Sequence, residues 1–230
     1  MTPQDRIIVA LDRPSTEANV QLVQDLSGAA RFFKVGMQQY YAGATPVFDA
    51  ISKAEASVFL DLKLHDIPAT VAGAMRSLAR HAPELITLHA SGGTHMIRAA
   101  VDALADASPN TKILAVTILT SMDADDVRGL TGHDDLEGTV RRLATRAIEA
   151  GAHGVVCSPH EADMLRGVVG DALIVTPGVR PRGADTQDQR RVMTPSEALE
   201  HGADYLVIGR PIHAQADPRA AFEHIVESLA

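Results

Sequence analysis

The sequence predicts an α/β protein folded as a single (β/α)8 barrel over residues 1–230. Eight short β-branched or aliphatic runs alternate with longer amphipathic segments, and no linker, charge block or low-complexity tract divides the chain. Strands separated by single helices run parallel, because each helix returns the chain to the same edge. Eight such units in 230 residues favour a closed TIM barrel over an open doubly wound sheet.

The strands are expected where aliphatic runs are bounded by turn residues. In order, they cover residues 6–11, 32–35, 57–62, 85–89, 113–118, 154–157, 173–176 and 205–208. The helices are expected where apolar residues recur with helical spacing, at residues 16–26, 46–53, 69–80, 96–107, 139–150, 161–168, 196–201 and 218–229. Two longer stretches, 121–138 and 180–194, are predicted to be irregular loops on the face where barrel enzymes do their chemistry.

Composition narrows the classes of partner. A formal charge of −8 argues against nucleic-acid binding, which needs an excess of Lys and Arg, but it allows a small anionic ligand at a local positive patch. A lone Cys157 cannot form an internal disulfide, so we expect a cytoplasmic protein. No apolar run is long enough to span a membrane, and the polar start of the chain is unlike a secretory signal.

Charged residues of alternating sign follow the first three expected strands. Asp12 ends the first, Lys34 lies in the second, and Asp61 and Lys63 close the third. Side chains alternate faces along a strand and neighbouring strands lie about 4.8 Å apart, so these four groups are expected within ionic reach of one another. Asp66, in the following loop, would make the row net negative.

Each charge alone has an ordinary structural explanation. Asp12 could be a turn residue, and Lys34 could extend out of its strand end. Complementary charges on three adjacent strands are better explained by function, since buried charge arrays add little stability. Flanking carboxylates favour the ammonium form of Lys63, which then suits a general acid better than a nucleophile.

Two Gly-Arg segments mark a candidate phosphate site. Gly178 and Arg180 follow the seventh expected strand, and Gly209 and Arg210 follow the eighth. Barrels commonly bind phosphate with the loops after these two strands, and guanidinium groups match phosphate oxygens. Either segment alone would be a weak signal. Together they predict a phosphorylated small substrate, with its reacting end over the first three strands.

The motifs together resemble the orotidine 5′-monophosphate decarboxylase family, of the bacterial type. Residues 61–70 read D-L-K-L-H-D-I-P-A-T, similar to the family signature D-x-K-x-x-D-I-P-N-T, and Ala69 stands where the family usually has Asn. Further similar segments are residues 7–12, 34–36, 119–121, 176–180 and 208–210. The resemblance implies conversion of orotidine 5′-monophosphate to uridine 5′-monophosphate and CO2 in pyrimidine biosynthesis, without cofactor or metal.

The resemblance also implies residue roles. Lys63 would protonate C6 of the pyrimidine, and Asp61 would lie beside the departing carboxylate. Lys34 and Asp12 would bind the ribose hydroxyls and complete the array. Three residues would reach into a partner subunit's site and so imply a homodimer: Asp66, Ile67 and Thr70. The remaining contacts would be Thr120 or Ser121 to the ring, Gln189 to phosphate or ring, and Arg180, Gly209 and Arg210 to phosphate.

Two alternatives remain open. A Mg²⁺-dependent sugar-phosphate decarboxylase or aldolase, of the 3-keto-gulonate-phosphate decarboxylase or hexulose-phosphate synthase type, shares an Asp-x-Lys-x-x-Asp motif. Lys34, together with Arg180 and Gln189, favours the nucleotide enzyme. A non-catalytic phosphate-binding barrel is the second alternative. The histidines at 65, 81, 89 and 95 lack metal-ligand spacing, and Cys157 is expected to be a small buried residue.

Overall fold

The computed structural model describes residues 1–181 and 193–229. Eight strands pair in sequence order, every pair parallel, and β8 pairs with β1 to close the barrel. The strands are β1 (Ile7–Ala10), β2 (Phe32–Gly36), β3 (Ser57–Leu64), β4 (Leu85–His89), β5 (Lys112–Val116), β6 (Gly154–Val156), β7 (Leu173–Pro177) and β8 (Tyr205–Ile208). The predicted barrel and its eight strands are confirmed.

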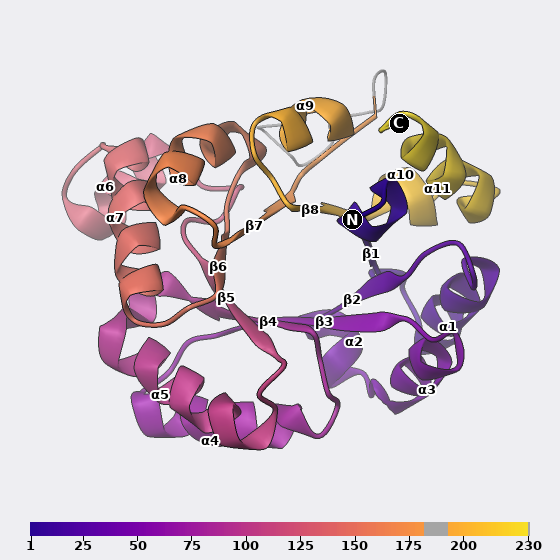
Figure 1. Ribbon diagram of the computed structural model, residues 1–230, viewed down its shortest axis with the longest axis horizontal. Helices are drawn as coiled ribbons and strands as arrows, with labels where there is room; N and C mark the ends of the chain where they lie inside the picture. The colour runs from indigo at the N-terminus through magenta and orange to yellow at the C-terminus, as the bar shows by residue number, and fades with distance from the viewer. Residues whose placement is uncertain (182–192, 230) are drawn as a thin grey trace.

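Helices surround the ring of strands on the outside (Figure 1). The α-helices are α1 (Thr16–Asp25), α2 (Met37–Tyr41), α3 (Thr45–Lys53), α4 (Pro68–Ala79), α5 (Gly93–Ala107), α6 (Ala124–Thr131), α7 (Leu136–Glu149), α8 (Ala162–Val169), α9 (Pro195–Glu200), α10 (Arg210–His213) and α11 (Pro218–Glu227). The described residues also form the short 3₁₀ helices η1 (Pro3–Arg6), η2 (Ala90–Gly92) and η3 (Pro159–Glu161). Among the residues described, no helix is both long and apolar enough to cross a membrane.

The expectation that residues 121–138 form an irregular loop is wrong. The segment contains α6 and the first turn of α7. The Asp123 side chain caps α6 by accepting hydrogen bonds from the backbone N–H groups of Asp125 and Asp126, both at 3.1 Å. Gly132 ends the helix with φ of 79°. Of the second expected loop, residues 182–192 lie outside the described part. Met193, near its end, forms an isolated bridge with Val179, just before its start.

Alternate residues of the strands belong to two apolar layers, one between the strands and the helices and one inside the barrel. On β1, Ile7 and Val9 pack outward against the helices, whereas Ile8 and Ala10 belong to the cluster inside the barrel. The inner cluster consists of Ile8, Ala10, Phe32, Phe59, Leu85, Leu114, Val116, Val156, Val175, Tyr205 and Val207. The barrel interior is therefore a packed apolar core, and polar side chains on the inward faces gather above it, at the carboxyl ends of the strands.

Candidate active site

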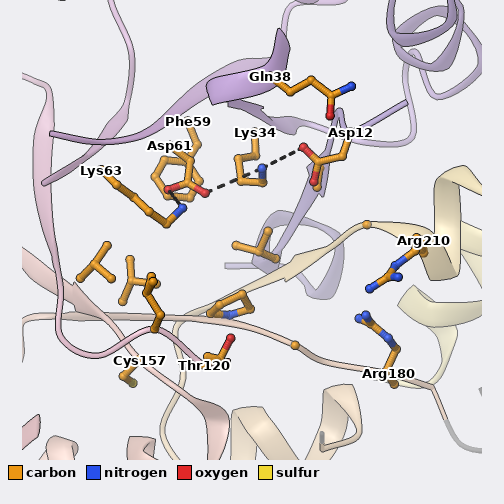
Figure 2. A pocket seen from close by; sticks show the side chains of 18 of the residues that line it. Asp12, Lys34, Gln38, Phe59, Asp61, Lys63, Thr120, Cys157, Arg180 and Arg210 are labelled. Carbon is orange, nitrogen blue, oxygen red and sulfur yellow. Dashed lines mark hydrogen bonds and ion pairs between the residues drawn. The ribbon is translucent and has the colours of Figure 1, made fainter. Parts of the chain in front are cut away.

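Four alternating charges form a continuous row at the carboxyl ends of β1, β2 and β3 (Figure 2). The Lys34 Nζ atom lies 3.1 Å from Asp12 Oδ1 and 3.7 Å from Asp61 Oδ2. The Lys63 Nζ atom donates to Asp61 Oδ1 at 2.7 Å. The ionic row expected from strand spacing is thus confirmed for all four members.

The local backbone around Lys63 departs from the simple alternation that the sequence suggested. The register between β3 and β4 shifts, since Leu60 pairs with Ile86 but Leu64 pairs with Leu88. Lys63 has φ of 50°, in the left-handed region that side chains other than Gly seldom adopt. This β-bulge brings Lys63 to Asp61 by a turn of the backbone rather than by the pleat of a regular strand.

Burial and charge oppose each other at Asp61. Burial by itself raises the pKa of the Asp61 carboxyl. The positive charges of Lys34 and Lys63, with hydrogen bonds from Lys63 and Thr87, outweigh burial and hold that pKa below its ordinary value of 3.8. The Asp61 side chain is 14% exposed. The centre of the row is therefore a carboxylate kept ionised in a poorly solvated place.

The row forms one wall of a cavity of about 550 Å³. Its floor is the upper layer of the inner apolar cluster: Ala10, Phe59, Val116, Val156 and Val207. Arg180 and Arg210 line the same cavity, with their guanidinium groups facing each other on the side away from Lys63 (Figure 2). The cavity thus has an electrostatic end at β1–β3 and a cationic end at β7–β8.

The backbone after β7 and β8 shapes the cationic end. Gly178 has φ of 81°, a conformation that suits glycine, and it lines the cavity with Gly209. Arg180 is 8% exposed, and its Nη1 donates to the carbonyl of Val179 at 2.9 Å. Gly209 precedes the short helix α10, whose first residue is Arg210. Planar guanidinium groups beside glycine backbone are well suited to phosphate oxygens.

Not every residue named by the resemblance lies in this cavity. Thr120 lines it, whereas Ser121 is exposed and is not part of the described wall. Asp66, Ile67 and Thr70 are also exposed, outside the described wall, and Ile67 is 67% exposed. The Asp66 carboxylate accepts a hydrogen bond from the Ile67 backbone N–H at 2.7 Å. Gln189 lies outside the described residues.

Three residues near the cavity escaped the sequence reasoning. Gln38 and His213 line it, and Thr87 hydrogen-bonds to Asp61 from β4 at 3.0 Å. The pKa of His213 is lowered mainly by burial, although the negative charge of Asp12 acts in the opposite direction. Gln38 could have been found from its position two residues after the Lys34-Val35-Gly36 motif, in α2. The buried Cys157 forms part of the wall, as expected of a small buried residue.

A closed parallel barrel with a Lys/Asp row at one end of its mouth and paired guanidinium groups at the other defines a (β/α)8-barrel enzyme. The chain belongs to the "Orotidine 5'-phosphate decarboxylase / HUMPS family", whose model matches residues 5–225. The family resemblance drawn from the motifs is confirmed.

Curated relatives and solved structures agree with this assignment. A protein of Thermobifida fusca named "Orotidine 5'-phosphate decarboxylase" is 50% identical, covering 97% of this chain and 95% of its own length. A protein of the same name from Moorella thermoacetica is 46% identical over all of this chain and 94% of its own. The crystal structure of orotidine 5'-phosphate decarboxylase from Lactobacillus acidophilus matches with a TM-score of 0.84 and 36% identity, covering 98% of this chain and 99% of that one.

Proposed function

We propose that this chain converts orotidine 5′-monophosphate to uridine 5′-monophosphate and CO2, the last step of de novo pyrimidine nucleotide biosynthesis, without a cofactor. The observation that carries the proposal is the Lys63 ammonium held 2.7 Å from the mostly buried Asp61 carboxylate, across one cavity from two guanidinium groups. The names of the relatives support the same substrate.

The reaction needs electrostatic stabilisation. Loss of CO2 from C6 leaves a carbanion in the plane of the pyrimidine ring, where no adjacent π-system can delocalise the charge. A cation placed where that charge develops lowers the barrier, and Lys63 then transfers a proton to C6. Asp61 makes a smaller contribution, by repelling the carboxylate of the bound substrate. Two negative charges about 4 Å apart repel by about 4 kcal/mol at an effective dielectric of about 20, which raises the energy of the substrate before CO2 leaves.

Substrate binding is assigned to the rest of the cavity. Arg180 and Arg210, with the Gly209 backbone, bind the phosphate, and Gln189 bridges to phosphate or ring. Asp12 and Lys34 bind the ribose hydroxyls, as their position between the two ends allows (Figure 2). Thr120 or Ser121 hydrogen-bonds to the pyrimidine. Binding energy from the phosphate, remote from C6, then serves to position the reacting carbon against Lys63.

A homodimer with shared sites completes the proposal. Asp66, Ile67 and Thr70 occupy an exposed segment directly after β3, and Ile67 is a large apolar side chain in contact with solvent. Such a side chain is suited to burial against a second copy. From there Asp66 would reach the partner's cavity and join its charge row. The cytoplasmic location expected from the single cysteine stays a prediction.

The decisive experiment follows the ultraviolet absorbance of orotidine monophosphate after addition of purified protein, with and without a chelator. Loss of absorbance that is unaffected by the chelator supports the proposal. Activity abolished by the chelator would contradict a metal-free reaction, and no loss of absorbance at all would exclude orotidine monophosphate as the substrate. The Lys63→Ala variant should lose turnover, and Lys53→Ala, at an exposed lysine of α3, should not. Unchanged turnover in Lys63→Ala would exclude the assigned role of Lys63, whereas a parent protein that does not turn over orotidine monophosphate would favour the non-catalytic phosphate-binding barrel.

A further inference from the structure

Thr87, on β4, is the only residue that faces the bulge of β3 in the pairing of these two strands. Leu60 pairs with Ile86 and Leu64 pairs with Leu88, so Asp61, Leu62 and Lys63 together lie opposite Thr87. On β4, Leu85 belongs to the inner cluster, whereas Ile86 and Leu88 pack outward. By alternation the Thr87 side chain points inward with Leu85, beneath the Lys/Asp row.

The Thr87 hydroxyl bonds to both functional residues of the bulge. Its Oγ1 accepts a hydrogen bond from the Lys63 backbone N–H at 2.8 Å and lies 3.0 Å from Asp61 Oδ1. A backbone N–H can only donate, so the hydroxyl proton is left for the carboxylate. The direction of both bonds is therefore fixed: Lys63 N–H to Thr87, and Thr87 O–H to Asp61.

These two bonds act where the chain is under strain and poorly solvated. Lys63 adopts φ of 50°, so its backbone conformation depends on surrounding contacts to persist. Thr87 is completely buried, and its Oγ1 is a hydrogen-bond acceptor for the Lys63 backbone N–H within the bulge. Loss of the hydroxyl would leave that amide without this acceptor and Asp61 Oδ1 without one of its two donors.

We propose that Thr87 is a positioning residue, which sets the distance and orientation between the Asp61 carboxylate and the Lys63 ammonium. Its importance for turnover rests on the proposed decarboxylation. The hydroxyl orients Asp61 directly and orients Lys63 through its backbone, and it thereby ties the two side chains to one rigid strand. A displacement of Lys63 by about 1 Å can lower turnover by roughly 100-fold.

Two matched substitutions separate positioning from packing. Thr87→Val keeps the branched shape and removes the hydroxyl, whereas Thr87→Ser keeps the hydroxyl and removes the methyl group. Positioning predicts that kcat falls by roughly 100-fold in the Val variant, with a much smaller change in KM, and that the Ser variant stays within about 3-fold of the parent. A packing role predicts the reverse order, because the Val side chain fills the site better.

A second measurement does not depend on turnover. Titration of the Asp61 carboxyl by carbon NMR should show a higher pKa in Thr87→Val than in the parent, and little change in Thr87→Ser, because only the Val variant loses the donor. If the parent does not decarboxylate orotidine monophosphate, the proposed function fails, and this titration still tests the placement of Asp61.

The outcomes that overturn the proposal are clear. They are a kcat in Thr87→Val equal to that of the parent, equal losses in the Val and Ser variants, or an Asp61 pKa that does not move in Thr87→Val. Should Thr87→Val fail to fold, Thr87→Ala replaces it, since Ala and Ser differ only in the hydroxyl. Urea unfolding of each variant confirms that the comparison is between folded proteins.

Discussion

Replacement of Lys34 by Met tests whether the charge row is held together by Coulomb attraction in a poorly solvated place. Lys34 is 7% exposed, and its ammonium lies 3.7 Å from Asp61 Oδ2. At an effective dielectric of about 20, two unit charges at that distance attract by about 4 kcal/mol. The Asp12 pair contributes less, because the Asp12 side chain is 46% exposed and solvent screens it. Removing one partner from a buried pair typically costs about 3–5 kcal/mol.

We therefore expect Lys34→Met to lower the free energy of unfolding by about 3 kcal/mol at pH 7. The pKa of Asp61 in the folded protein lies below its ordinary value of 3.8. The ionised Asp61 therefore stabilises the folded protein above about pH 3.8, and this contribution is lost as the pH falls through the folded pKa. In the variant, the Asp61 pKa rises, and protonation relieves the unpaired charge. The difference in free energy of unfolding between parent and variant should accordingly become smaller as the pH is lowered from 7 to 4.5.

Urea unfolding followed by circular dichroism, at both pH values, measures these differences. Lys34→Met, Asp61→Asn and the double variant form a cycle whose coupling energy should be about 2 kcal/mol. Arg141→Met is the matched control, because Arg141 pairs with Glu137 on an exposed face of α7 and its loss should change stability by less than about 0.5 kcal/mol. A coupling energy near zero, or a difference that does not vary with pH, would refute the electrostatic account.

Three further changes test other parts of the molecule. Arg210→Ala should raise the KM for orotidine monophosphate by roughly 10–100-fold, because a hydrogen bond to a charged group is lost. Turnover of orotidine, which lacks the phosphate, should not change, and an equal loss of activity with both substrates would contradict a phosphate contact. Burial lowers the pKa of His153, whose neutral Nδ1 accepts from the Ile113 N–H at 3.1 Å. Stability should thus fall as pH drops below about 6.5, and urea unfolding of His153→Asn should show a weaker pH dependence; an unchanged slope would refute this. Ile67→Asp should produce monomers in sedimentation and lower activity, whereas Leu130→Asp, at an exposed residue of α6, should do neither; dimeric, active Ile67→Asp would exclude the proposed interface.

The sequence was sufficient to predict the barrel because each strand and most helices carry their own periodic signal. No expected strand boundary, and no boundary of the eight expected helices, differs from the structure by more than three residues. The row of Asp12, Lys34, Asp61 and Lys63 could be predicted for a related reason: consecutive parallel strands place their ends side by side.

The features that sequence reasoning missed depend on long-range pairing or on very short elements. The positive φ of Lys63 has no local signal, since it follows from how β3 is paired with β4, and so the role of Thr87 was also invisible. Helix α6 was missed because it is only eight residues long and opens with acidic residues that resemble a loop. Its signal was the Asp123 cap and the closing Gly132.

The position of the row directly above an apolar floor gives the charges their effect. The side chains of Val116, Val156 and Val207 offer no dipoles to solvate an ion, so the potential in the cavity beside the row is set mainly by the fixed charges around it. In water, Lys63 and Asp61 would reorient as charge developed on the substrate. Here their separation is fixed by direct contact with each other and with Thr87, and most of the cost of ordering them is met when the barrel folds.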